Sequence, residues 1–202
     1  MLPVSGAHLR LTCQPGKEGT AYVFRYAAEN VAQLPLLVMD AMPRVDPATR
    51  KVSANADASP VLLLEDGSVL IGKYIAPLPQ DRAVMAPDLP LCVRLEPGQT
   101  IERVLRLPLP FAETSPYFHD LGLRDYEPVE AKGVVLAIGY WPAEAPGIYA
   151  AACAYSPEHL VVAVTLAPVL ARLGWLAIPA KKLEILRRKD AFPRVLKSHG
   201  NP

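Results

Sequence analysis

Proline is the feature that most constrains the fold of this chain. The 202 residues include 22 prolines, about one in every nine. An internal proline removes a backbone donor and clashes with the preceding helical turn, so long helices are excluded over most of the sequence. Short strands joined by loops accommodate this spacing. We therefore predict a mostly β protein with little helix.

Alternation of polar and apolar residues predicts where the strands lie. The clearest alternation covers residues 8–13 and 20–30, and residues 133–141 are apolar on both faces, as in a central strand that is covered on both sides. Shorter runs predict further strands at residues 35–39, 61–64, 69–71, 91–95 and 101–107. Many short strands separated by turn signals indicate a sandwich or a barrel.

Three turn signals connect these runs. Pro15-Gly16 and Pro97-Gly98 fit the central positions of type II turns, which predicts two antiparallel strand pairs. Asp66-Gly67 between apolar runs predicts a hairpin with a type I′ turn. Two polar stretches that contain prolines, residues 40–60 and 108–132, are expected to be long loops, and loops of that length are often functional.

The last third of the chain leaves helix and strand open over residues 143–180. Ser156 and Pro157 fit the first positions of a helix. The β-branched residues that follow fit a strand, which we favour. Residues 160–178 are nearly long enough to cross a membrane, but Pro168 and Arg172 interrupt the run, and we expect no membrane span.

Residues 22–30, YVFRYAAEN, alternate large apolar and polar side chains and lead into a loop. In this they resemble bacterial immunoglobulin-like modules, including the domains of intracellular proteinase inhibitors. The resemblance implies an immunoglobulin-like antiparallel β-sandwich with long proline-rich loops. It also implies one functional alternative, an intracellular proteinase inhibitor that acts through the 108–132 loop.

The charge distribution separates the C-terminal end from the rest of the chain. The net charge is only +1, so no specific nucleic acid partner is expected. Residues 181–197 contain seven basic and two acidic residues, a local charge of +5. We predict a single β-sandwich domain over residues 1–186 and a basic tail over 187–202. This stretch is either a solvated face, which we favour, or a contact for an acidic partner, an RNA or anionic lipid through Lys181, Lys182, Arg187, Arg188 and Lys189.

Cysteine usage bears on the compartment. Cys13, Cys92 and Cys153 cannot all pair within one chain, and the first eleven residues lack the basic and apolar regions of a secretory signal. We therefore expect buried thiols and a cytoplasmic location. The alternative is one disulfide between Cys13 and Cys92 with a spare thiol.

Residues 115–127 concentrate polar and aromatic side chains on one predicted loop. Binding loops are commonly carried on a rigid β scaffold, so this segment is a candidate contact for a protein partner. The candidate residues are Tyr117, Phe118, His119, Asp120, Arg124, Asp125 and Tyr126. His119 lacks a second histidine or a cysteine at ligand spacing, so we predict no bound metal and no cofactor.

No motif in the sequence predicts catalysis. A Gly-x-Ser-x-Gly elbow and a glycine-rich phosphate loop are both missing, and the short separation of Cys153 and His159 does not define a catalytic dyad. We predict a non-catalytic β-sandwich that binds another protein or forms a homo-oligomer, because the last third is too apolar for a small isolated domain. The alternatives are the proteinase inhibitor and a metal or small-ligand site around His119.

Overall fold

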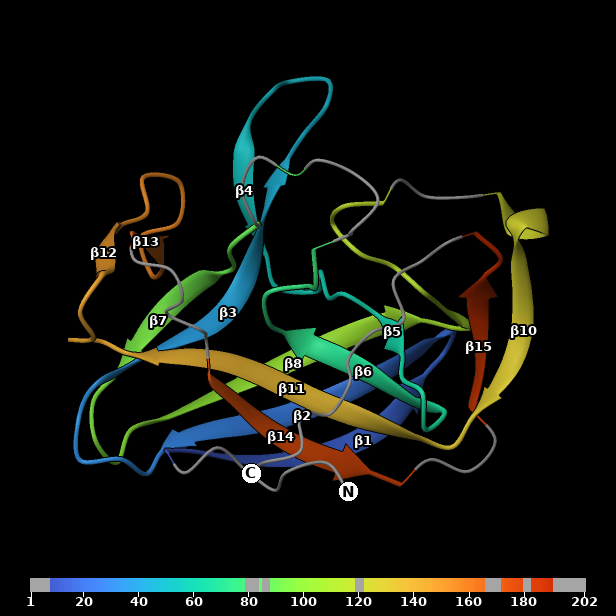
Figure 1. Ribbon diagram of the computed structural model, residues 1–202, viewed down its shortest axis with the longest axis horizontal. Helices are drawn as coiled ribbons and strands as arrows, with labels where there is room; N and C mark the ends of the chain where they lie inside the picture. The colour runs from blue at the N-terminus through green and yellow to red at the C-terminus, as the bar shows by residue number, and fades with distance from the viewer. Residues whose placement is uncertain are drawn as a thin grey trace.

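The computed structural model describes residues 8–78, 84, 88–118, 122–165, 172–179 and 183–190. Within these residues it contains fifteen strands, and the only helical segment is the 3-10 helix η1, Leu123–Asp125. The predicted mostly β fold is confirmed. The strands form three open sheets, which are not closed into a barrel (Figure 1).

The first sheet has three antiparallel strands in the order β1-β2-β8. They are β1 (Leu9–Glu18), β2 (Ala21–Asn30) and β8 (Thr100–Pro108). The predicted turn at Pro15-Gly16 is wrong, because β1 pairs with β2 over its whole length and the chain reverses at Gly19, where φ is 56°. A proline fits within β1 because β1 is an edge strand of this sheet.

The largest sheet has nine strands and forms the centre of the molecule. Its main path is β12-β13-β7-β3-β11-β6-β5, β4 pairs with β3, and β14 pairs with β11. The strands are β3 (Leu36–Val45), β4 (Val52–Asn55), β5 (Leu62–Leu63), β6 (Ser68–Lys73), β7 (Leu91–Leu95), β11 (Gly133–Pro142), β12 (Ile148–Ala152), β13 (Leu160–Val164) and β14 (Arg172–Ile178). As predicted, β11 is a central strand that is buried over nearly all of its length.

Two strand pairs run parallel, which differs from the antiparallel arrangement that we expected. One is β6 with β11, where Gly72 lies against Ala137 so closely that a Cβ atom on Gly72 would stand 2.0 Å from the Ala137 carbonyl oxygen. The other is β9 (Phe111–Ala112) with β15 (Leu183–Arg188), in a sheet whose third strand is β10 (Tyr126–Ala131).

Both predicted long loops contain strands. Residues 40–60 include the end of β3 and β4, which form a projecting hairpin (Figure 1). Residues 108–132 include β9, η1 and β10. Their polar residues and prolines indicated loops, but the strands here pair with partners that are distant in sequence or at a sheet edge, and such pairing tolerates polar residues.

The remaining turn predictions are partly confirmed. Glu96 to Gln99 forms the predicted turn, with Gly98 at φ 78°, but it joins β7 and β8 in different sheets and not a strand pair. The hairpin between β5 and β6 is present, yet Gly67 has a positive φ and Asp66 does not, so its turn is not type I′.

The main core lies between the β1-β2-β8 sheet and the largest sheet. It continues toward β15, so all three sheets share it. Its buried side chains include Phe24, Leu105, Val38, Leu136 and Ile185. The apolar residues 160–178 form β13 and β14 in their described part, and no helix among the described residues is long and apolar enough to cross a membrane. Cys13, Cys92 and Cys153 are all free thiols, so the alternative Cys13–Cys92 disulfide is not formed.

Candidate functional site

The predicted partner-contact segment is largely packed into the protein where the structure describes it. His119 and Asp120 lie outside the described residues. Phe118 and Tyr126 are buried. Tyr117 is half-buried, and its hydroxyl oxygen accepts a hydrogen bond of 3.0 Å from the backbone N–H of Asp88.

The structure brings this segment together with the basic C-terminal stretch, because β10 pairs with β15. Arg188 ends β15 and is 1% exposed. Its guanidinium lies 5.3 Å from the centre of the Phe118 ring and donates two hydrogen bonds to Asp190. Its backbone N–H donates to Glu113, and burial raises the pKa of that carboxyl. Arg188 therefore packs inside the protein.

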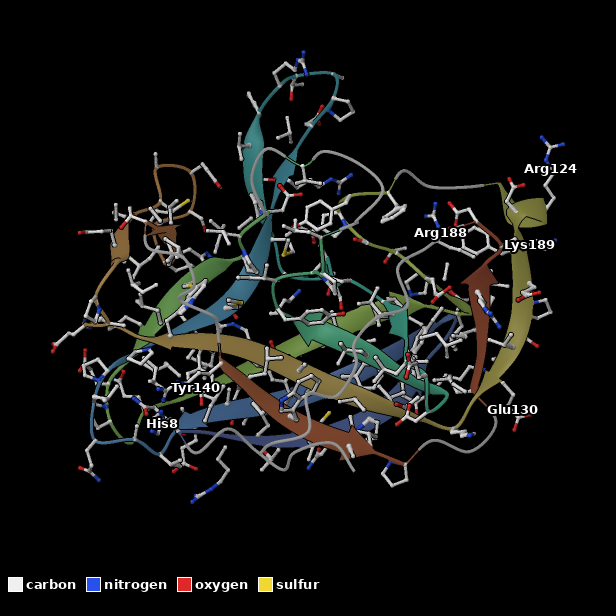
Figure 2. All side chains as sticks on the ribbon, viewed as in Figure 1. His8, Arg124, Glu130, Tyr140, Arg188 and Lys189 are labelled. Atoms are coloured by element: carbon white, nitrogen blue, oxygen red, sulfur yellow. The ribbon has the colours of Figure 1, made fainter. Side chains whose placement is uncertain are left out.

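The other described basic candidates also contact this segment. Arg187 Nε lies 3.4 Å from a carboxylate oxygen of Glu127. The ammonium group of Lys189 donates a hydrogen bond of 2.8 Å to the carbonyl oxygen of Arg124. The backbone N–H of Lys189 donates to the carbonyl oxygen of Asp125. Figure 2 shows Arg124, Arg188 and Lys189 at one end of the molecule. Lys181 and Lys182 lie outside the described residues.

A second group of polar side chains, which sequence reasoning missed, connects the loop of the β12–β13 hairpin to β3 and to β8 of the β1-β2-β8 sheet. Asp40 on β3 is 3% exposed and accepts hydrogen bonds from Arg103 on β8, with Nε 2.8 Å from Oδ1 and Nη2 2.9 Å from Oδ2. His159, which ends the loop of the hairpin, places Nε2 3.0 Å from Asp40 Oδ2. Its Nδ1 lies 2.6 Å from the hydroxyl oxygen of Ser156. We call these four residues the Asp40 network.

The hydrogen-bonding capacity of the network is satisfied in one arrangement. With the ring proton assigned to Nε2, His159 donates to Asp40 and its Nδ1 accepts the Ser156 hydroxyl proton. The bonds from Arg103 to Asp40 raise the pKa of the guanidinium above its usual value. Asp40 reaches the network because it is an extra residue in β3, between the pairs that Met39 and Ala41 form with β7.

Lys73, the last residue of β6, adds a further buried cation near Asp40. It is 1% exposed, and its ammonium group donates hydrogen bonds to the carbonyl oxygens of Ala56 and Ala58. Burial lowers the pKa of Lys73 to about 8, although Asp40 and Asp57 act in the opposite direction. The segment that follows β4 is therefore held to the centre of the largest sheet.

The side-chain types of the network are those of a catalytic triad, but the geometry favours a structural role. In serine hydrolases the serine contacts Nε2 and the carboxylate contacts Nδ1, and here the two ring nitrogens are exchanged. Ser156 is 8% exposed, and Arg103 already neutralises Asp40. The network fastens the hairpin loop from Cys153 to His159 onto β3.

The hairpin that this network holds is apolar on both faces. The strand sequences are IYAAA in β12 and LVVAV in β13. On the inner face, Ile148 and Val162 are buried against β3, β7 and β11. On the outer face, Tyr149 is 62% exposed and Val161 is 43% exposed, next to exposed alanines. An exposed patch of this kind is typical of an interaction surface.

Among the described residues, no strand pairs with the outer edge of the hairpin. β12 ends the main path of the largest sheet and pairs with β13 alone among the described strands. The hydrogen bonds from Thr165 N–H to Gly147 and from Cys153 N–H to His159 set the phase of the ladder. Because an antiparallel ladder alternates, the backbone groups of Ala150 and Ala152 point to the open edge. Figure 1 shows the hairpin beyond β7, at one end of the sheet.

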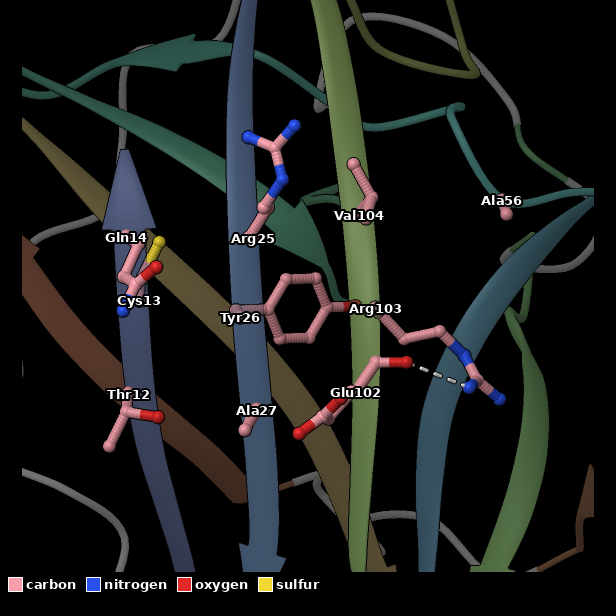
Figure 3. A pocket seen from close by; sticks show the side chains of 10 residues that line it. All are labelled: Thr12, Cys13, Gln14, Arg25, Tyr26, Ala27, Ala56, Glu102, Arg103 and Val104. Atoms are coloured by element: carbon pink, nitrogen blue, oxygen red, sulfur yellow. Dashed lines mark hydrogen bonds between the residues drawn. The ribbon is translucent and has the colours of Figure 1, made fainter. Parts of the chain in front are cut away.

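A pocket of about 860 Å³ lies against the β1-β2-β8 sheet (Figure 3). Its cationic side chains are Arg25 and Arg103, and both already contact carboxylates, those of Glu18 and Asp40. An anionic ligand would have to compete with these pairs. Across the residues that the structure describes, no group of three metal-binding side chains occurs.

One sequence signal for the network was available. Asp40 interrupts the otherwise apolar run of residues 35–42, and an acidic residue within a buried strand needs a partner. The partners Arg103 and His159 are 63 and 119 residues away, so the sequence does not indicate which residues they are.

Comparisons with models of protein families, with curated proteins and with solved structures found no match.

Proposed function

We propose that this chain is a non-catalytic protein-binding module on an immunoglobulin-like β-sandwich scaffold, and that its binding surface is the β12–β13 hairpin. The observation that carries the proposal is the combination of an open strand edge with an exposed apolar face. All ten strand residues of the hairpin are apolar. Unprotected edges of this kind pair readily with another strand.

The Asp40 network supports this function because it fixes the hairpin before a partner arrives. The contact between His159 and Ser156 closes the hairpin loop, and Arg103 connects Asp40 to the β1-β2-β8 sheet. A surface that is already ordered loses less conformational entropy on binding.

The hairpin is a better candidate surface than the 108–132 segment. A proteinase inhibitor would need that segment to project into a cleft. Phe118 and Tyr126 are instead buried, and Tyr117 is half-buried. The hairpin offers the larger exposed apolar side chains, Tyr149 and Val161.

Site-specific photo-crosslinking in the expressing cell tests the proposal. A photoreactive benzoyl-phenylalanine replaces Tyr149 in one variant and Val45 in the control. Val45 is 54% exposed near the tip of the β3–β4 hairpin, so the probe is equally accessible there. We expect a discrete protein adduct from position 149 and none from position 45. The proposal fails if position 149 gives no adduct, or gives the same diffuse adducts as the control.

A further inference from the structure

We infer that the occupant of the open edge is a second copy of this chain, with β12 paired antiparallel to β12 of the partner about a two-fold axis at Ala150. This inference rests on the proposed function and names the partner of the same surface. A two-fold dimer joined at an edge strand requires this antiparallel arrangement.

The backbone groups at the edge match this register. Ala150 of each copy donates its N–H to the carbonyl oxygen of Ala150 of the partner subunit. Ala152 of each copy donates to Ile148 of the partner subunit. These are the groups that the alternation within β12–β13 leaves pointing outward. The Ile148 N–H is already bonded to the Ala145 carbonyl oxygen, so each copy contributes two donors.

The side chains also match themselves in this register. On the outer face, Tyr149 lies opposite Ala151 of the partner subunit. On the inner face, Ile148 lies opposite Ala152 of the partner subunit. Each large side chain therefore meets a small one, and no two bulky groups compete for space.

Charge favours the same occupant. Neither β12 nor β13 carries a charged residue, so pairing β12 with itself places no like charges opposite each other. A strongly charged partner strand would find no complementary group on this hairpin.

The other longer edge strands of the described sheets are protected against such pairing. β1 carries Arg10, Pro15 and Lys17, β8 carries one glutamate and two arginines, and β10 carries Pro128 between two glutamates. β14 begins with an arginine and lies against β1, where its Gly174 approaches Leu9. Charges and prolines at an edge are the usual means of blocking it. The lack of both in β12 distinguishes this edge from those of the other described strands of five or more residues.

The first test measures the mass of the full chain by light scattering at tens of micromolar. We expect a species of twice the 21.9 kDa of the chain. Ala150→Pro removes the outward N–H at an edge position and should give a monomer. Ala150→Ser keeps that N–H and should remain a dimer. A wild-type monomer at this concentration overturns the inference.

The second test reports the register and does not depend on the proline variant folding. Ala150→Cys places two thiols at the two-fold axis, within the Cα separation of a disulfide, and should form a covalent dimer on oxidation. Ala152→Cys, two residues along the same edge, should not crosslink to itself. Equal crosslinking of both variants, or of neither, would overturn the proposed register.

The two proposals fail in different ways. Photo-crosslinking at position 149 that yields an adduct with a different protein, while the purified chain is monomeric, removes the second copy and keeps the protein-binding function. A monomeric chain that also gives no adduct removes both.

Discussion

Two hairpins project from the largest sheet, and they differ in how they are held and in what they expose (Figure 1). The β3–β4 hairpin is closed locally, because Asp46 accepts hydrogen bonds from the N–H groups of Ala48 and Thr49. Its exposed Val45 and Val52 are flanked by basic residues. The β12–β13 hairpin is apolar throughout and is held by the Asp40 network.

Exposed apolar side chains occur on both hairpins, so by themselves they do not single out a binding surface. Val45 is nearly as exposed as Tyr149, yet it stands in a charged hairpin. What distinguishes the β12–β13 hairpin is an uncharged open edge held in place by buried polar groups. The predictions below test each part of this distinction.

The largest effect is expected from removing the centre of the Asp40 network. Asp40→Ala leaves Arg103 and His159 without their acceptor and should lower the free energy of unfolding by about 3–5 kcal/mol. Asp46→Ala, in the other hairpin, removes only exposed local bonds and should change it little. Urea denaturation measures both variants. A cost for Asp40→Ala no larger than that for Asp46→Ala would refute the structural role of the network.

The next effect concerns Lys73, whose ammonium group binds the carbonyl oxygens of Ala56 and Ala58 just after β4. Its pKa is 10.5 in the unfolded chain and about 8 in the folded protein. Between these values the unfolded state binds more protons, so the Lys73 contribution to stability rises as the pH increases from about 8 to 10.5. Below pH 8 both states are protonated and the contribution is constant at its least favourable value.

Lys73→Met removes this pH dependence. The stability of the variant relative to the wild type should therefore fall between pH 8 and 10, by at most about 3 kcal/mol. Burial raises the pKa of Cys13 to about 11, but that thiol is present in both proteins and cancels in the comparison. Unfolding curves at several pH values provide the test, and a difference that is independent of pH would contradict it.

A smaller effect is expected at the loop of the β12–β13 hairpin. Ser156→Ala removes the hydroxyl that His159 Nδ1 contacts and should cost about 1–3 kcal/mol. Hydrogen exchange should show faster exchange at Cys153, whose N–H bonds to the His159 carbonyl oxygen. Glu144→Ala, at an exposed side chain just before the hairpin, serves as the control and should change neither measurement. Equal stability and equal exchange at Cys153 in the two variants would show that the Ser156–His159 contact does not hold the hairpin loop.

The sequence predicted the fold best where local and distant constraints agree. β2 and β11 were predicted from alternation and from an unbroken apolar run, and both strands are central in their sheets. Pro97-Gly98 predicted its turn correctly, whereas Pro15-Gly16 did not. Pro15-Gly16 instead lies within β1, because β1 pairs with β2 along its full length. Such pairing overrides a local turn preference.

The candidate site was harder to predict because it is built from distant residues. The apolar last third indicated an interaction surface, but the helix or strand choice for residues 143–180 could not be made from periodicity alone. The sequence predicted an exposed loop over 115–127 and a solvated basic stretch over 181–197, whereas β10 and β15 pair and Arg188 is buried. Pairing between distant segments determines which polar residues reach solvent, and periodicity does not report it.

The smallest change in stability is expected from one exposed substitution on each hairpin, and this pair of variants compares the two hairpins as binding surfaces. Val161→Asp and Val45→Asp both replace an exposed valine, so each should alter the free energy of unfolding by no more than about 0.5 kcal/mol. Their effects on association should differ. Val161 pairs with Ala151, which faces Tyr149 of the partner subunit in the inferred dimer, and a carboxylate there would lose water on assembly. We expect sedimentation equilibrium to show dimerisation weakened about tenfold or more by Val161→Asp, which corresponds to about 1.4 kcal/mol. Val45→Asp should leave it unchanged, because the β3–β4 hairpin already carries charge near its tip. Equal weakening by both variants would mean that general surface apolarity, and not the β12 edge, drives association.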